Sequence, residues 1–286
     1  MADLIQTNTV GEAWLAAMEL MLSRDGKAIN LSVAFPAAAS EEISLREEID
    51  AFVEERNLRY QDGNLLTVGT VANTIFPDAL YHPHLGKDAA PRLYENYALS
   101  MRMHRRRKND KETYFNRLIA YPVAPDTDDP KKLLNADGSW NQLDYYVQRL
   151  ASQRKKGHLS SSYELGVSHP QDVELRVQTP FRDKRVTSFP CLSHISLTLV
   201  DDHVHMNATY RNQTFVTRAF GNYLGLARLL RFIATETGAQ PGEVQVVATH
   251  ADTETSELGS SEVRKLVERC RTLMDVAAAD KEATRV

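Results

Sequence analysis

Three side chains of reactive or polar type lie at the ends of predicted regular elements in the second half of the chain. Cys191 directly precedes a predicted strand, Arg211 ends the next strand, and Asn222 opens a helix. Side chains at such ends can converge on one cleft. A nucleophile that adds to carbon 6 of a pyrimidine makes carbon 5 an enamine-like carbanion. This addition needs a thiolate, a cation that lowers the thiol pKa, and an amide that holds the polar edge of the ring, and the three residues supply those groups.

Two alternating strands position the cysteine and the arginine. From Ser193 to Val200 apolar residues alternate with polar ones, Asp201-Asp202 forms a turn, and the alternation resumes from His203 to Tyr210. Strict alternation indicates a strand with one buried face, and an acidic dipeptide between two strands is typical of a hairpin turn. We therefore predict a hairpin over 193–210.

The helix that carries the asparagine is predicted over Asn222–Thr237. Its polar stripe is narrow, which is typical of a largely buried helix. Gly238 ends it as a C-cap, and Pro241-Gly242 is predicted to turn the chain into a strand over Val244–Thr249.

The rest of the chain shows mainly helical periodicity. Helices are predicted over Gly11–Leu22, Ser44–Asn57, Ala89–Tyr121, Asn141–Gln153 and Ser261–Met274, a strand over Ile29–Phe35, and a surface loop over Pro122–Gly138.

The stretch from about residue 140 to 250 resembles the thymidylate synthases and their pyrimidine hydroxymethylase relatives. Pro190-Cys191, the hairpin ending Tyr210-Arg211, and Ala219-Phe220-Gly221-Asn222 before the buried helix carry the resemblance. Arg211 follows Cys191 by 20 positions and Asn222 follows Arg211 by 11, as in the family. The Asn141-Gln142 helix is similar to the family's Asp-Gln helix.

The resemblance implies an α+β fold, with a mixed sheet packed against helices and forming the interface of a homodimer. It implies one domain over 1–286, with a divergent N-terminal half (1–139), a signature half (140–252) and a C-terminal helix (253–286).

The resemblance also implies roles for individual residues. Cys191 would attack carbon 6, Arg211 would bind the substrate phosphate, and Asn222 would hydrogen-bond a uracil-type ring. His194, Asn212 and Gln213 are further candidates for substrate binding. The implied substrate is a small-molecule pyrimidine nucleotide or nucleoside, and the implied cofactor is 5,10-methylenetetrahydrofolate, the source of a methyl or hydroxymethyl group for carbon 5.

Several positions depart from the family. Leu192 stands where a histidine is usual, Asn212-Gln213-Thr214 replaces Ser-x-Asp, and Arg154, Lys155 and Lys156 stand just before the place of the paired phosphate-binding arginines. The N-terminal half lacks the tryptophan-containing segment with the general-base glutamate, so Glu54, Glu55 and Glu164 are the carboxylates to test. The alternative is a non-catalytic nucleotide-binding or assembly protein on the same scaffold.

Bulk composition narrows the class of partner. A formal net charge of -4 and a sequence pI near 6.2 give the protein no overall positive potential that would attract nucleic acid or an anionic membrane. Two cysteines are too few for a disulfide framework, and the N-terminus lacks the pattern of a secretory signal, so we expect a cytoplasmic protein with no membrane span. His203 and His205 have no second cluster that would complete a zinc site, so no metal is expected.

Overall fold

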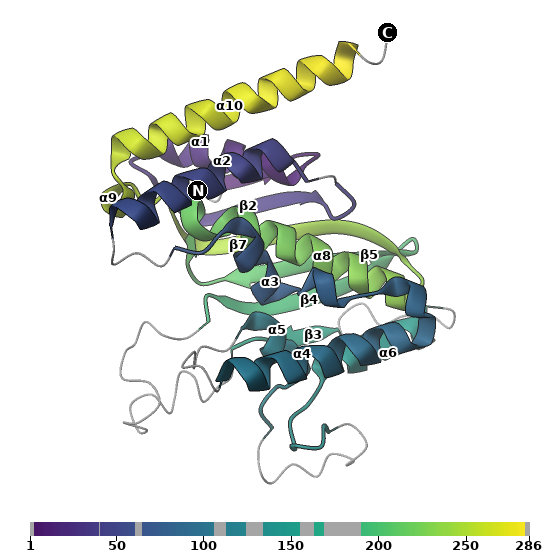
Figure 1. Ribbon diagram of the computed structural model, residues 1–286. Coiled ribbons are helices and arrows are strands. Elements are labelled where there is room, and N and C mark those ends of the chain that lie inside the picture. Colours follow the sequence, from purple (N-terminus) through teal and green to yellow (C-terminus); the bar gives the residue numbers. More distant parts are fainter. Residues whose placement is uncertain are drawn as a thin grey trace. The chain divides into compact units, whose positions relative to one another are not determined.

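The computed structural model describes residues 3–39, 41–60, 65–105, 113–123, 134–154, 163–168 and 190–283 (Figure 1). The chain forms two compact units. Unit 1 comprises Met1–Asn73, Tyr210–Arg228 and Glu243–Val286, and unit 2 comprises Thr74–Thr209 and Leu229–Gly242. Both units combine strands with helices, so the α+β class is confirmed.

The strands of unit 1 form a mixed sheet. Strand β1 (Asp3–Gln6) runs parallel to β2 (Lys27–Pro36), and β2 runs antiparallel to β7 (Gln240–Asp252). The short β6 (Gln213–Thr214) pairs in parallel with the end of β7. Alternate residues of β2, namely Leu31, Val33 and Phe35, are at most 1% exposed, which explains why this apolar run forms a half-buried strand.

Three helices of unit 1 lie side by side, as Figure 1 shows for α1 (Val10–Leu22), α2 (Ile43–Arg59) and α10 (Ser260–Ala283). The Thr9 hydroxyl caps α1 by accepting a hydrogen bond from Glu12 N at 3.1 Å. Helix α10 is longer than predicted. Its Arg271 pairs with Glu19 of α1 and its Arg269 with Glu48 of α2, so ion pairs to both neighbours accompany its apolar contacts.

The predicted hairpin is confirmed in unit 2. Strand β4 (Leu192–Val200) and strand β5 (His203–Tyr210, the last residue of which belongs to unit 1) are neighbours, and β3 (Glu164–Gly166) pairs antiparallel with β4. Asp201 and Asp202 have φ values of 47° and 66°. A two-residue turn with both central residues in the left-handed region matches the twist of the strands, and aspartate tolerates that region.

One long helix predicted in unit 2 is divided, and another is confirmed. The pattern over 89–121 divides into α4 (Ala89–Arg105) and α5 (Tyr114–Ile119), and residues 106–112, which include Arg106, Arg107 and Lys108, lie outside the described residues. The Thr113 hydroxyl accepts from Asn116 N at 3.1 Å and so starts α5 anew. Helix α6 (Gln142–Gln153) confirms the prediction, and the short helices η1 (Asp78–Leu80) and η2 (Pro83–Asp88) precede α4.

Both α8 (Phe220–Thr237) and β7 begin earlier than predicted. A π-helical turn over Phe215–Ala219 leads into α8, and Gly238 at φ 71° ends it as expected. The predicted turn at Pro241-Gly242 is wrong, because both residues belong to β7. A Cβ on Gly242 would lie 2.9 Å from His205 and Val204 atoms, so this glycine allows a close approach of β5 rather than a turn.

The remaining helices are α3 (Val68–Ile75) and the four-residue α9 (Thr255–Leu258). None of the helices in the described ranges combines the length and the apolar character needed to cross a membrane.

Candidate active site

Cys191 lies immediately before β4 in unit 2 and is a partly exposed free thiol. Ser193 Oγ donates to Thr209 O at 2.9 Å, so the start of β4 lies beside the end of β5. The other thiol, Cys270 on α10, is fully buried, and burial raises its pKa to about 12. Because the thiolate is the nucleophile, Cys191 is the cysteine that can react.

A carboxylate and an imidazole meet on the half-exposed face of the β3–β4 pair. His194 Nε2 lies 2.5 Å from Glu164 Oε2, and Ser196 Oγ donates to the same oxygen at 2.6 Å. His194 and Ser196 are two apart on β4, and the strand alternation therefore turns both side chains toward Glu164. His194 and Ser196, which follow Cys191 closely in sequence, thus form one cluster with Glu164 of β3, in which Glu164 accepts and the other two donate or share a proton.

The predicted substrate segment after β5 lies in unit 1, and it contacts a residue that the sequence reasoning missed. Asn212 Oδ1 lies 2.7 Å from Nδ1 of His250, which comes from β7. The two residues are 38 positions apart, but the parallel β6–β7 pairing, with Gln213 opposite Ala251, sets their side chains next to each other. The sequence signal that could have identified His250 is the position of this histidine near the end of the last strand.

Gln213 and Asn222 are buried rather than exposed in a wide cleft. Gln213 is 2% exposed and Asn222 is 4% exposed. Among the described residues Gln213 Nε2 has no hydrogen-bond partner. A buried donor without a partner costs about 1–3 kcal/mol, so such groups need an explanation, and a bound ligand oxygen is one.

The turn between β6 and α8 is held by Glu254, which directly precedes α9. Its carboxylate accepts from Thr217 N at 2.8 Å and from Thr217 Oγ1 at 2.6 Å. Burial raises the pKa of this carboxyl, although the hydrogen bonds from Thr217 and from Val216 N oppose the shift. Glu254 therefore fixes the π-helical turn that leads to Asn222.

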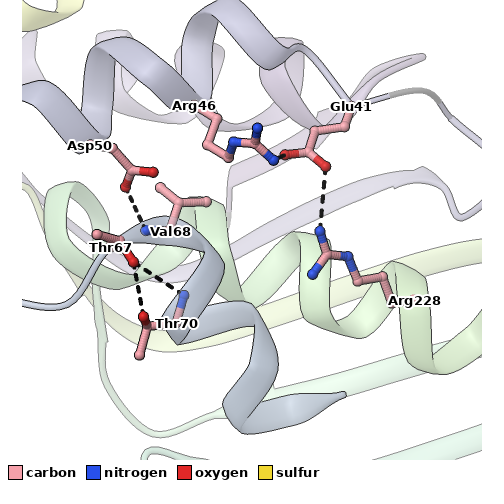
Figure 2. Close-up of polar contacts among 7 residues, drawn as sticks. All are labelled: Glu41, Arg46, Asp50, Thr67, Val68, Thr70 and Arg228. Carbon is pink, nitrogen blue, oxygen red and sulfur yellow. Dashed lines mark hydrogen bonds and ion pairs between the residues drawn. The ribbon is translucent and has the colours of Figure 1, made fainter. Parts of the chain in front are cut away.

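The first turn of α8 packs against α3. A Cβ on Gly221 would lie 2.7 Å from Val71 Cβ and 2.8 Å from Val68 O, so only glycine permits this approach. In Figure 2, Asp50 of α2 accepts from Val68 N at 2.6 Å and so caps α3. Burial is the main cause that raises the pKa of Asp50.

Figure 2 also shows Glu41 between two arginines. Arg46 Nη1 lies 2.7 Å from Glu41 Oε1, and Arg228 Nη2 of α8 lies 3.4 Å from Glu41 Oε2. Both guanidinium groups are at most 31% exposed. These contacts join α8 to the residues just before α2.

The candidate carboxylates differ sharply in their surroundings. Glu54 and Glu55 are exposed on α2, and Glu55 forms an i,i+4 ion pair with Arg59 at 2.6 Å. Glu164 alone of the three belongs to the same unit as Cys191. Of the expected phosphate ligands, Arg154 forms an ion pair with Asp202, while Lys155 and Lys156 lie outside the described residues.

The structure thus groups the predicted residues into two sets. Unit 1 holds Arg211, Asn212, Gln213 and Asn222, and unit 2 holds Cys191 and His194. The convergence of the two sets stays a prediction. In the part of the chain that the structure describes, no three His, Cys, Asp or Glu side chains gather so as to hold a metal ion.

Comparison with known proteins gives a distant relationship. No family model matches the chain. It is 24% identical over 142 residues to a protein of Methanococcoides burtonii named "Putative thymidylate synthase", a match that covers 49% of this chain and 59% of that protein. Proteins of the same name from Methanosarcina mazei and Methanosarcina barkeri are 25% and 23% identical over 121 residues, 42% of this chain and 49% of each relative. The chain thus spans about half the length of the curated relatives it matches, and it is distantly related to thymidylate-synthase-like proteins.

Proposed function

We propose that the protein uses Cys191 as a nucleophile on carbon 6 of a pyrimidine nucleotide or nucleoside, and so activates carbon 5 for a one-carbon transfer from 5,10-methylenetetrahydrofolate. The observation that carries the proposal is that Cys191 is the only partly exposed thiol of the two and stands at the start of a confirmed hairpin whose far end leads into Arg211. The relationship to thymidylate-synthase-like proteins supports the same chemistry.

Substrate recognition is proposed for the unit 1 set. Arg211 binds the phosphate, and Asn222 hydrogen-bonds the uracil-type ring. His250 joins Asn212 as a further polar contact to the sugar or ring, and the unpaired Gln213 Nε2 donates to a ligand oxygen. Each of these groups is a neutral or cationic donor, which suits the oxygen atoms of a nucleotide.

The reaction also needs a proton acceptor. We propose the Glu164–His194 pair, because a carboxylate that contacts an imidazole can take up and pass on a proton. His194 follows Cys191 by three residues, about 10 Å along a strand at roughly 3.3 Å per residue, so the pair acts on the substrate through water rather than on the thiol. A homodimer is proposed on the family resemblance, with Leu4 and Ile29 of the unit 1 sheet, 69% and 68% exposed, as apolar candidates for the interface.

The test is tritium release from carbon-5-labelled dUMP, UMP, dCMP and CMP, with and without methylenetetrahydrofolate. We expect release by the wild type, none by Cys191→Ala, and a shifted pH profile for Glu164→Gln, with Glu55→Gln as the matched control. Sedimentation equilibrium of the same preparations gives the oligomeric state. No release from any substrate, with nucleotide binding intact in Cys191→Ala, would refute the enzymatic proposal and leave the non-catalytic nucleotide-binding protein.

A further inference from the structure

The strand that carries the proposed proton acceptor has a backbone edge that no strand covers. Among the described strands β3 pairs only with β4. Tyr163 O accepts from Leu197 N at 2.9 Å, and Val167 N donates to Ser193 O at 3.1 Å, so these residues of the segment bond to β4. Backbone groups of successive residues point to opposite sides of a strand. The N–H and the carbonyl of Gly166 therefore point to the outer edge of β3.

A buried glutamine of α6 binds that edge. Gln142 is 1% exposed, its Nε2 donates to Gly166 O at 2.6 Å, and its Oε1 accepts from Gly166 N at 3.0 Å. Nε2 also donates to Arg117 O at 3.0 Å, so both of its N–H groups are used. The side-chain amide thus bonds to Gly166 as a neighbouring strand would, and it closes an edge that would otherwise stay open.

A second glutamine of α6 holds the residue just before β3. Gln153 Oε1 accepts from Tyr163 Oη at 2.5 Å, and the ring of Tyr163 lies edge to face with that of Tyr146 at 6.4 Å. Gln142 and Gln153 are eleven positions apart, which is about three helical turns, so both lie on the same side of α6. Helix α6 therefore holds this segment both before and after Glu164.

The register of β3 against β4 decides whether Glu164 meets its partners. Glu164 is opposite Ser196, and Gly166 is opposite His194. Glu164 therefore accepts from Ser196 straight across the pair, whereas its 2.5 Å contact with His194 runs diagonally. Diagonal neighbours lie roughly 7–8 Å apart, so only long side chains in the correct register can span them. Because Gln142 binds the residue opposite His194, it fixes the spacing that the Glu164–His194 pair must span.

We propose that Gln142, supported by Gln153, is a positioning residue of the Glu164–His194 pair and acts through the backbone of β3. The inference rests on the proposed function, in which this pair accepts the proton of the reaction. Gln142 itself is buried and bonds only to backbone groups, so it takes no part in proton transfer. Its amide keeps the Glu164 carboxylate within hydrogen-bonding distance of the imidazole, and proton transfer depends on that contact.

The first test measures the contact itself and needs no catalysis. In protein isotope-labelled at histidine and glutamate, the wild type should show a nuclear Overhauser cross-peak between the His194 ring and the Glu164 side chain. The cross-peak should be lost in Gln142→Met, which keeps the length of the side chain and removes the amide. Gln148→Met is the matched control on the same helix, because the Gln148 amide is exposed and donates to Asp144, and this variant should retain the cross-peak.

A second variant covers the case in which Gln142→Met does not fold. Loss of the Gln142 amide leaves three backbone groups without their partner, so folding is checked by circular dichroism. Tyr163→Phe removes only the hydroxyl that bonds to Gln153, so it should fold and should weaken the same cross-peak. An unchanged cross-peak in the folded variants overturns the proposal.

The second test asks whether Gln142 acts through Glu164. Gln142→Met should lower kcat of tritium release about tenfold and leave KM unchanged, because a slightly misplaced catalytic group loses much of its effect. In the Glu164→Gln background the same substitution should cause no further loss, whereas a purely structural defect would slow both backgrounds. A further loss in that background overturns the proposal. If the wild type releases no tritium, the proposed function fails, and the cross-peak alone decides whether Gln142 positions the pair.

Discussion

Removal of the Glu254 carboxylate should lower the free energy of unfolding more than removal of the carboxylate of an exposed glutamate does. Glu254→Ala leaves Thr217 N, at 2.8 Å in the wild type, and the hydrogen-bonded Val216 N without their acceptor. The Thr217 hydroxyl loses less, because Thr214 Oγ1 lies 3.2 Å away as a second partner. With about 1–3 kcal/mol for each unsatisfied buried donor and partial access of water, we expect a loss of about 3 kcal/mol in the free energy of unfolding.

Glu254→Gln keeps one acceptor oxygen and should lose only about 1 kcal/mol, equivalent to one hydrogen bond. The pH dependence has a definite sign. Because the folded protein raises the pKa of Glu254 above its ordinary value of 4.5, folding binds protons at this site. Its contribution to stability is full below the ordinary pKa and is lost as the pH rises through the folded pKa. The difference between wild type and Glu254→Gln should therefore be smaller at pH 8 than at pH 5.

The assay is urea unfolding followed by circular dichroism at both pH values. Glu257→Ala is the matched control, because Glu257 is exposed on α9 and its carboxylate accepts, among the described residues, only from Ser256 Oγ. Its backbone oxygen, which accepts from Arg56 Nη2, is kept in the variant. If Glu254→Ala loses no more than Glu257→Ala, Glu254 does not hold the turn before α8. If the deficit of Glu254→Gln grows with pH, the sign of the pKa argument is wrong.

Two other measurements check the packing and the thiols. Gly221→Ala should cost about 2 kcal/mol by urea unfolding, because its Cβ would overlap Val71 and the backbone of α3. Gly69→Ala, where no atom lies within 4 Å of the new Cβ, should instead gain about 0.5–1 kcal/mol, and equal effects would contradict the close approach of α3 and α8. A disulfide reagent should titrate one fast thiol in the native protein, and this thiol should disappear in Cys191→Ala, since the buried Cys270 reacts only on unfolding. A fast thiol that persists in Cys191→Ala would show that Cys270 is the accessible one.

Local patterns in the sequence predict the elements around the candidate site well. The alternation over Ser193–Tyr210 and the Asp201-Asp202 turn give the hairpin, because both signals depend only on neighbouring residues. The apolar face of α8 and its Gly238 cap follow in the same way. Pro241-Gly242 misleads, because a glycine that allows close approach of a neighbouring strand has the same sequence signature as one in a turn.

Contacts between segments that lie far apart in the sequence cannot be predicted from such local patterns. His250 meets Asn212 only because β6 pairs with the end of β7, and a two-residue strand leaves no periodic signal. Glu254 and Asp50 look like solvated acids in the sequence, yet both accept backbone hydrogen bonds from another helical segment. Helix propensity cannot reveal such caps, because the acid lies far in sequence from the N–H that it satisfies.

These caps also narrow the choice of a catalytic carboxylate. In unit 1, Glu42, Asp50 and Glu254 each accept a hydrogen bond from a backbone N–H, namely those of Gly11, Val68 and Thr217. A backbone amide does not release its proton near neutral pH, so these hydrogen bonds stabilise the local structure and do not transfer protons.

Glu164 differs in the kind of donor that it faces. Its partners are the imidazole of His194 and the hydroxyl of Ser196, and an imidazole can act as a general acid or base. A structural role of Glu164 would make Glu164→Gln lower stability and leave the pH profile of tritium release unchanged. A role in proton transfer would move that profile even where the variant is fully folded, because the glutamine amide can neither accept the proton nor stabilise the imidazolium. The pH profile of one folded variant therefore separates a proton-transfer role of Glu164 from a structural one, a distinction that the loss of activity in Cys191→Ala does not test.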